Sequence, residues 1–438
     1  MTTRRDIDRR LRALALPAVG ALAVEPLYVA VDTAIIGRVG TRELAGLALA
    51  ATVLSVVGAG SNVIAYAATE RIARYRGASD TTRAATIATQ SLWLALGLAV
   101  VVTPLVATVG RLMTRAVDID TVTAAHAVRY LWVSSLGLPA VLVTMAAQGV
   151  MRGYGEYRRP LRILAVSHGA NVVIEVIAVF GLQMSVTGSA LSTVIAQWLA
   201  ATWFLSGVRP FIAARGARGP QWLELTRLAR VSGVLTIRVG AMLVILSGAT
   251  VVAGRSGSGV IAAHQIVMGM FILLALVLDA VALPAQTMVG EAVGLGDRNI
   301  VALTARRVYI HSVAIGAAGT GVLVLAAGPV ARIFTTDTDV VNAAADGLTV
   351  LAIGLTAGAL AFAGDGVLIG AGDHVFLAVA SVVHTVVIAA VLAVTARMPD
   401  VAHIWWLFAL WLSMRAVTVI GRTTVLVSRV QRSSAALT

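Results

Sequence analysis

The apolar stretch LALPAVGALAVEPLYVAVDTAII, from Leu14 to Ile36, decides the fold class of this chain. Glu25 and Asp32 are its only charged residues. Because an α-helix of about 20 mostly apolar residues crosses the hydrocarbon core of a bilayer, the stretch is predicted to span a membrane. Arginines precede it, as in a signal peptide, but the run is long and lacks a small-residue cleavage site. We therefore interpret it as an uncleaved first helix.

The rest of the chain repeats this pattern. Hydrophobic residues make up 58% of the 438 residues, charged residues only 13%, and the mean hydropathy is +0.89. These values lie outside the usual range of soluble domains. We predict an all-α polytopic membrane protein with twelve transmembrane helices. The predicted helix cores are residues 14–36, 44–68, 84–109, 130–151, 163–182, 190–208, 234–253, 260–289, 308–327, 350–369, 376–396 and 404–419.

The charge of the chain orients its helices. All 34 basic residues are arginines, and most of them flank apolar runs, so the net charge of +13 does not indicate a nucleic-acid partner. If the N-terminus is cytoplasmic, 24 arginines fall in cytoplasmic segments and seven on the opposite face. Cytoplasmic loops are rich in arginine and lysine. We therefore expect a multi-pass protein of the bacterial inner (plasma) membrane with both termini in the cytoplasm.

The absent residue types narrow the chemistry. Without lysine the chain cannot form the phosphate-binding loop G-x-x-x-x-G-K-[ST], which argues against an ATP-driven pump. Without cysteine it has no disulfide, thiolate metal site or cysteine nucleophile. Secondary transport of small molecules across the lipid bilayer remains, with no cofactor beyond a coupling ion, H⁺ or Na⁺.

An internal repeat appears at an offset of 217 residues. QGVMRGYGE from Gln148 then matches DGVLIGAGD from Asp365. We predict two six-helix lobes, residues 1–208 and 228–438, joined by a cytoplasmic linker at 209–227. Because six is even, both lobes enter the membrane from the same side, as parallel repeats related by a pseudo-two-fold axis along the membrane normal.

Two Asp-x-Asp pairs resemble a metal-binding motif. The pair Asp118 and Asp120 has an equivalent in the second repeat, Asp337 and Asp339, and each pair precedes a predicted helix. Helix capping explains both pairs without a metal ion.

The first lobe places ionisable residues inside predicted spans, where a charge is costly and is therefore a functional candidate. Glu25 and Asp32 are seven residues apart and share one helix face, as do His168, Asn171 and Glu175. If the two stripes face each other, their carboxyl groups can carry a proton or hold a sodium ion. The alternative is that these carboxylates only satisfy backbone or arginine donors.

The second lobe has a charged set of its own. Its members within predicted spans are Arg238, Asp279, Asp365 and Arg415. Structural ion pairs and a role in coupling are both open for them. Aromatic residues such as Tyr28, Trp132 and Phe362 can line a cavity for organic cations.

Several of these segments resemble one family. EPLYVAVDTAIIGRVG from Glu25, NVVIEVIAVFGL from Asn171, GSALST from Gly188 and LDAVALPAQTMVGEAVGLGD from Leu278 are similar to segments of the multidrug and toxic compound extrusion (MATE) family, DinF branch. The resemblance covers nearly the whole chain. It implies two six-helix lobes around a V-shaped central cavity and export of amphipathic, often cationic compounds against a proton or sodium gradient. We expect the protein to act as a monomer.

The resemblance also implies roles for single residues. The ion-coupling set is Asp32, Asn171, Glu175, Thr193 and the carbonyl of Ala190, with sodium, if it binds, at the first three. The resemblance also places Glu25 and Asp365 at the substrate cavity. Tyr28, His168, Asp279 and Arg238 are predicted to line the same cavity from their aromatic or charged side chains within spans. Glu175 stands where the family usually has aspartate, and Arg38 replaces a frequent histidine. The longer side chain of Glu175 leaves the choice between proton and sodium open.

Two alternative functions are less consistent with the sequence. A flippase for lipid-linked precursors needs several arginines to bind a pyrophosphate, but only Arg129, Arg238 and Arg415 lie within spans. A membrane prenyltransferase needs clustered aspartates for magnesium pyrophosphate. The close aspartate pairs are already assigned to helix caps, so an enzyme is the less favoured alternative.

Overall fold

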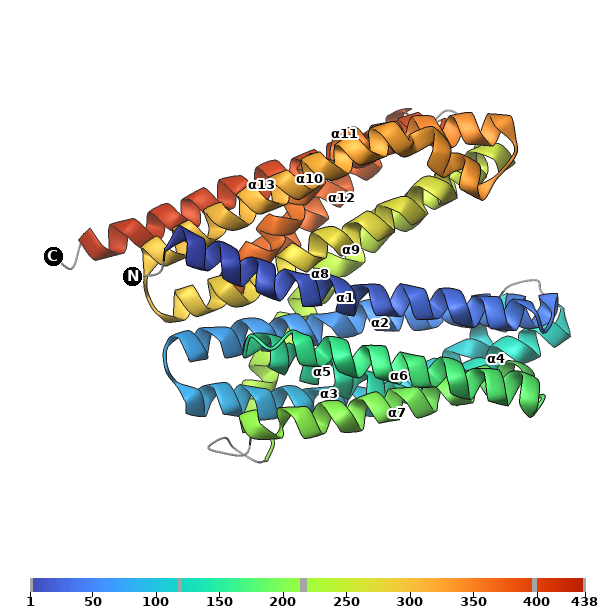
Figure 1. The fold of residues 1–438 in the computed structure, drawn as a ribbon, viewed down its shortest axis with the longest axis horizontal. Helices are drawn as coiled ribbons and strands as arrows, with labels where there is room; N and C mark the ends of the chain where they lie inside the picture. The colour runs from blue at the N-terminus through green and yellow to red at the C-terminus, as the bar shows by residue number, and fades with distance from the viewer. Residues whose placement is uncertain (1–2, 117–119, 213–218, 396–399, 436–438) are drawn as a thin grey trace. The chain divides into compact units, whose positions relative to one another are not determined.

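The computed structural model describes residues 3–116, 120–212, 219–395 and 400–435 (Figure 1). Within these ranges the chain is helical, without strands. The helices are α1 (Arg4–Gly37), α2 (Thr41–Gly77), α3 (Thr81–Ala116), α4 (Thr121–Ser135), α5 (Leu138–Gly153), α6 (Arg158–Val176) with its π-helical end η1 (Ile177–Gly181), α7 (Ser185–Ile212), α8 (Trp222–Arg255), α9 (Ser258–Gly294), α10 (Arg298–Phe334), α11 (Thr338–Ala371), α12 (His374–Thr395) and α13 (Val401–Ala435).

The described helices fit the predicted number of membrane spans. Eleven of them are long and apolar enough to cross a bilayer, and α4 with α5 forms a bent pair that makes a twelfth if counted as one span. The all-α, polytopic prediction is confirmed. The predicted linker 209–227 lies partly outside the described residues, because residues 213–218 are not described.

The bend between α4 and α5 has a cause in the sequence. The predicted core 130–151 is broken between the two helices, whose axes meet at 51°. Pro139 lies in the first turn of α5, where its missing N–H and its ring end the preceding helix. At the 217-residue offset Pro139 corresponds to Thr356, and there α11 runs unbroken.

Aspartates begin several helices, as the sequence suggested. Asp120 Oδ1 accepts hydrogen bonds from the backbone N–H groups at the start of α4, and Asp337 does the same for α11. Helix capping is therefore confirmed for these two aspartates. The other member of the first pair, Asp118, lies outside the described residues.

The chain packs as two compact units. Residues 20–232 form the N-terminal unit, and residues 1–19 with 233–438 form the C-terminal unit. In the N-terminal unit α5 packs against α2, α3 and α7, and in the C-terminal unit α11 packs against α9, α10 and α13. The helices α1 and α8 each contribute to both units, because the boundaries fall inside them.

Glycines allow the same helix contact in both units. A Cβ on Gly149 of α5 would lie 2.6 Å from the Ala65 carbonyl oxygen of α2, and a Cβ on Gly366 of α11 would collide with the Ala282 carbonyl oxygen of α9. These two pairs are related by the 217-residue offset. Only small residues allow backbones to approach this closely within membranes. Both units therefore contain the same close helix–helix contact.

Candidate ion and substrate site

Three helices of the N-terminal unit carry the residues expected to bind the coupling ion. Asp32 lies on α1, Asn171 and Glu175 on α6, and Ala190 and Thr193 on α7. Asp32 is 5% exposed, Asn171 1% and Glu175 0%. These polar groups are cut off from solvent, so each needs a partner inside the protein or a bound ion.

Hydrogen bonds join the three helices. The Ser189 hydroxyl donates to Asp32 Oδ1 over 2.5 Å, and Asn171 Nδ2 donates to Thr193 Oγ1 over 3.3 Å. Ser192 Oγ donates to Asn171 Oδ1 over 3.4 Å. The structure therefore brings Asp32, Asn171 and Thr193 into one polar network, together with two serines that were not singled out from the sequence.

Glu175 is buried beside this network but does not share its well-aligned hydrogen bonds among the described residues. Asp32 and Ser189 lie beside its carboxyl group, yet neither carboxyl oxygen forms a well-aligned hydrogen bond with a described residue. Two neighbouring carboxylates withdrawn from water repel each other unless a proton or a cation lies between them. The pair can therefore hold an exchangeable cation.

Tyr28 and His168 border the network. The Tyr28 hydroxyl lies 2.7 Å from Thr193 Oγ1, and the Tyr28 ring lies 4.8 Å from the His168 ring between centroids. The structure thus joins Tyr28 and His168 to the ion-coupling residues. Glu25 is different, since its side chain is exposed and takes no part in the hydrogen bonds of this network among the described residues.

Tyr130 is a site residue that the sequence did not reveal. It lies on α4, is buried, and its hydroxyl is near Asp32 and Glu175 and within hydrogen-bond reach of Ser189 and Thr193. A tyrosine near the end of an apolar run gives no contrast that marks it as functional. Ser189 did have a signal, since it falls inside the quoted segment GSALST.

The C-terminal unit contains a buried charge cluster. Arg238 Nη2 of α8 and Arg415 Nη2 of α13 both donate to Asp365 Oδ2 of α11, each over 2.5 Å. The three side chains are nine-tenths or more buried. Ion pairing, one of the two possibilities left open for Arg238, Asp365 and Arg415, is therefore present.

Arg415 is held by more than this carboxylate. Its guanidinium lies 4.8 Å from the Trp411 ring centroid and 5.1 Å from that of Phe362. Asp279 of α9 also acts on it electrostatically. Arg238, Asp279 and Asp365, predicted as cavity residues, thus belong to one electrostatic cluster.

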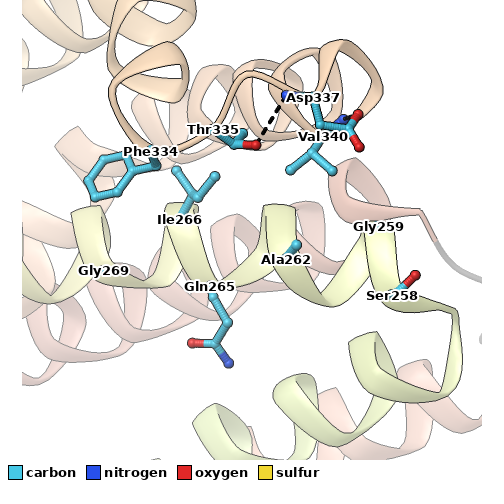
Figure 2. Close-up of a pocket in the computed structure, with 10 residues that line it drawn as sticks. All are labelled: Ser258, Gly259, Ala262, Gln265, Ile266, Gly269, Phe334, Thr335, Asp337 and Val340. Atoms are coloured by element: carbon cyan, nitrogen blue, oxygen red, sulfur yellow. Dashed lines mark hydrogen bonds between the residues drawn. The ribbon is translucent and has the colours of Figure 1, made fainter. Parts of the chain in front are cut away.

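A surface groove of the C-terminal unit shares no lining residue with either cluster. It has a volume of about 660 Å³ and is formed by the start of α9, the end of α10 and the start of α11 (Figure 2). Its lining residues are Ser258, Gly259, Ala262, Gln265, Ile266, Gly269, Phe334, Thr335, Asp337 and Val340. Asp337 already caps α11, and none of the predicted site residues lines the groove.

Comparisons with known sequences place this chain among transporters. Protein DETOXIFICATION 44, chloroplastic, of Arabidopsis thaliana is 29% identical over 432 residues, covering 94% of this chain and 81% of that protein. DNA damage-inducible protein F of Escherichia coli (strain K12) is 30% identical over 296 residues, covering 66% and 64%. Probable multidrug resistance protein NorM of Thermotoga maritima is 25% identical over 356 residues, covering 77% and 74%.

Solved structures share the fold. MATE in the bent conformation matches with a TM-score of 0.90 at 19% identity, over 99% of this chain and 98% of that one. An outward-facing multidrug resistance MATE family transporter of the MOP superfamily matches with a TM-score of 0.88 at 18% identity, over 98% and 97%.

Apolar spans with polar groups buried inside them are typical of a multi-pass membrane transporter. The family model MatE matches the chain twice, over residues 17–177 and 240–395. The chain belongs to the multidrug and toxic compound extrusion (MATE) family, and the resemblance seen in the sequence is confirmed.

Proposed function

We propose that the protein is a secondary antiporter that exports amphipathic, cationic compounds in exchange for protons, or for sodium, by alternating access. The observation that carries this proposal is the Glu175 carboxyl group, which is fully buried beside Asp32 and Ser189 and whose two oxygens form no well-aligned hydrogen bond with any described residue. A buried pair of carboxyl groups can bind a proton or a small cation. Its relatives include multidrug resistance proteins, which supports a drug-like cargo.

Transport of the cargo is coupled to the ion because both compete for the same negative charge. With the Asp32 and Glu175 pair ionised, the N-terminal unit attracts a cationic cargo, and uptake of a proton or sodium ion removes that attraction. Binding of ion and cargo is then reciprocal and negatively coupled. A proton gradient or sodium gradient directed into the cell thereby drives cargo out.

The donor set is compatible with either ion. Asp32, Glu175, Asn171 and Thr193 offer the oxygen atoms that a hard cation such as sodium requires. The additional methylene of Glu175, compared with aspartate, alters the spacing of the oxygens that a sodium ion would require and favours a proton instead. We therefore place protons first as the coupling ion.

The arginines of the C-terminal unit do not favour a flippase. Arg238 and Arg415 both bind Asp365, so their charge is already engaged and a pyrophosphate would have to displace a buried carboxylate. We further propose that the protein acts as a monomer in the bacterial inner membrane, with both termini in the cytoplasm.

Reconstituted transport tests this function. Purified protein in proteoliposomes should move ethidium against its concentration gradient when an inward-directed proton gradient is imposed. Under an inward-directed sodium gradient the rate of ethidium movement should be lower. Asp32→Asn and Glu175→Gln should abolish this movement, whereas Asp297→Asn, which changes an exposed helix cap of α10, should not. Ethidium movement by Asp32→Asn at the wild-type rate would refute the mechanism.

A further inference from the structure

The first helix belongs to both units. α1 is one helix from Arg4 to Gly37, yet residues 1–19 group with the C-terminal unit and residues from Gly20 onward with the N-terminal unit. Ile7 and Leu11 are each 2% exposed and lie in a core formed with residues of α9, α10 and α11. The start of α1 is therefore an integral part of the C-terminal unit.

Charged contacts fix this start. Asp8 accepts two hydrogen bonds from Arg307, one from Nε over 2.6 Å and one from Nη2 over 2.5 Å, and lies 3.0 Å from His311 Nε2. Two residues further along α1, Arg10 pairs with Glu291 over 2.6 Å. A two-pronged arginine–carboxylate contact constrains both distance and angle. These five residues are called the α1 anchor below.

The other end of the same helix carries the ion site. Asp32 lies 24 positions after Asp8, which is about 36 Å along an α-helix at about 1.5 Å per residue. Pro17 and Pro26 lie between them. Each proline removes one helical hydrogen bond and makes the helix easier to bend there.

Fixing one end changes what a movement at the other end does. If the start of α1 were free, a change at Asp32 could move the whole helix without any effect on the C-terminal unit. If the start is held by the α1 anchor, the same change must bend α1 in its proline-containing middle or pull on α9 and α10. Only in the second case does ion uptake at Asp32, in the N-terminal unit, lead to a change in the C-terminal unit.

We propose that Asp8 is a positioning residue for transport, which holds the start of α1 in the C-terminal unit so that ion uptake at Asp32 becomes a conformational change. The proposal rests on the proposed antiport function. It assigns Asp8 no contact with ion or cargo, and it predicts that loss of the anchor separates cargo binding from cargo movement.

A matched ion pair is available as a control. Asp373 accepts hydrogen bonds from Arg422 Nε over 2.5 Å and Nη2 over 3.2 Å, in the same unit. The Asp373 and Asp8 side chains are 17% and 16% exposed. The Asp373 contact joins the segment after α11 to α13 and does not involve α1.

The experiment compares Asp8→Asn with Asp373→Asn in proteoliposomes, with equal amounts of folded protein. For Asp8→Asn we expect ethidium binding, and its displacement by protons, within twofold of wild type, while gradient-driven ethidium transport falls at least fivefold. For Asp373→Asn both should stay within twofold. Asp8→Glu, which keeps the charge, should recover part of the transport.

Three outcomes would overturn the proposal: transport by Asp8→Asn within twofold of wild type, an equal loss in binding and transport, or an equal transport loss in Asp373→Asn. Failure of the antiport function is distinguishable, because wild-type protein would then show no gradient-driven transport at all.

A second variant covers the case in which Asp8→Asn does not fold. The chain contains no cysteine, so Asp8→Cys provides a single thiol for labelling the folded protein. A methanethiosulfonate reagent carrying a sulfonate should raise transport at least threefold over the unlabelled variant, because it returns a negative charge beside Arg307. The trimethylammonium reagent should not, and an equal response to both reagents would contradict the proposal.

Discussion

Ser189 and Asp32 lie 157 positions apart in the sequence, and the serine hydroxyl donates a 2.5 Å hydrogen bond to the aspartate carboxyl group. Both side chains are buried. A hydrogen bond to a carboxylate is about twice as strong as one between neutral groups. This contact therefore fixes the position of the Asp32 carboxyl group against α7, where a cationic cargo would meet it.

Replacing Ser189 tests the contribution of this donor. A hydrogen bond to a charged group contributes about 1.5–3 kcal/mol, so Ser189→Ala should weaken ethidium binding about tenfold or more. Ser192→Ala should have a smaller effect, because Ser192 donates to Asn171 and to a backbone carbonyl and not to a carboxyl group. Fluorescence titration of the purified proteins measures both, and equal affinities for Ser189→Ala and wild type would contradict the prediction.

Tyr130 permits a milder test. Tyr130→Phe keeps the buried ring and removes only the hydroxyl that lies within reach of Ser189 and Thr193. A neutral hydrogen bond contributes about 0.5–1.5 kcal/mol, so ethidium transport should fall about twofold to tenfold while the melting temperature stays close to that of wild type. A large loss of folded protein would instead show that the hydroxyl is needed for folding.

The buried charges of the C-terminal unit give a prediction about stability. Asp365→Asn leaves Arg238 and Arg415 facing each other without their shared carboxylate. An uncompensated buried charge costs about 3–5 kcal/mol. Arg238→Met removes one of two cations from a single carboxylate and still leaves a pair, so it should destabilise less.

Thermal unfolding in detergent, followed by size-exclusion chromatography, ranks these two variants. We expect the order wild type, Arg238→Met, Asp365→Asn from most to least stable. The reverse order for the two variants would mean that Asp279, which also acts on Arg415, replaces Asp365 as the main counter-charge.

Some of this site could be read from the sequence and some could not. Asp32 and Glu175 stand out because a carboxyl group inside an apolar run is costly, so its presence alone carries information. Tyr130 gives no such contrast, since a tyrosine is acceptable at many positions of a spanning helix. The residues that complete the network become visible only when α4 and α7 are packed against α1.

Some features of the fold could be predicted from the sequence and others could not. The 217-residue repeat predicts the halves, and Pro139 explains why α4 and α5 are separate while α11 is continuous. The packing partner of residues 1–19 could not be predicted, because an apolar helix face such as that of Ile7 and Leu11 is compatible with many neighbours. Only the three-dimensional contacts assign it to the C-terminal unit.

The repeated glycine contact leads to the last prediction. Gly149→Ala would place a methyl group 2.6 Å from the Ala65 carbonyl oxygen, so α5 must move away from α2. Overpacking of this kind costs about 1–3 kcal/mol. Gly58 of α2 has open space around its Cβ position, and there alanine should stabilise the helix by about 0.5–1 kcal/mol because it restricts the unfolded backbone. Melting temperatures should therefore move in opposite directions for Gly149→Ala and Gly58→Ala. A shift of the same sign in both would show that helix propensity, and not the close approach of α5 to α2, determines the requirement for glycine.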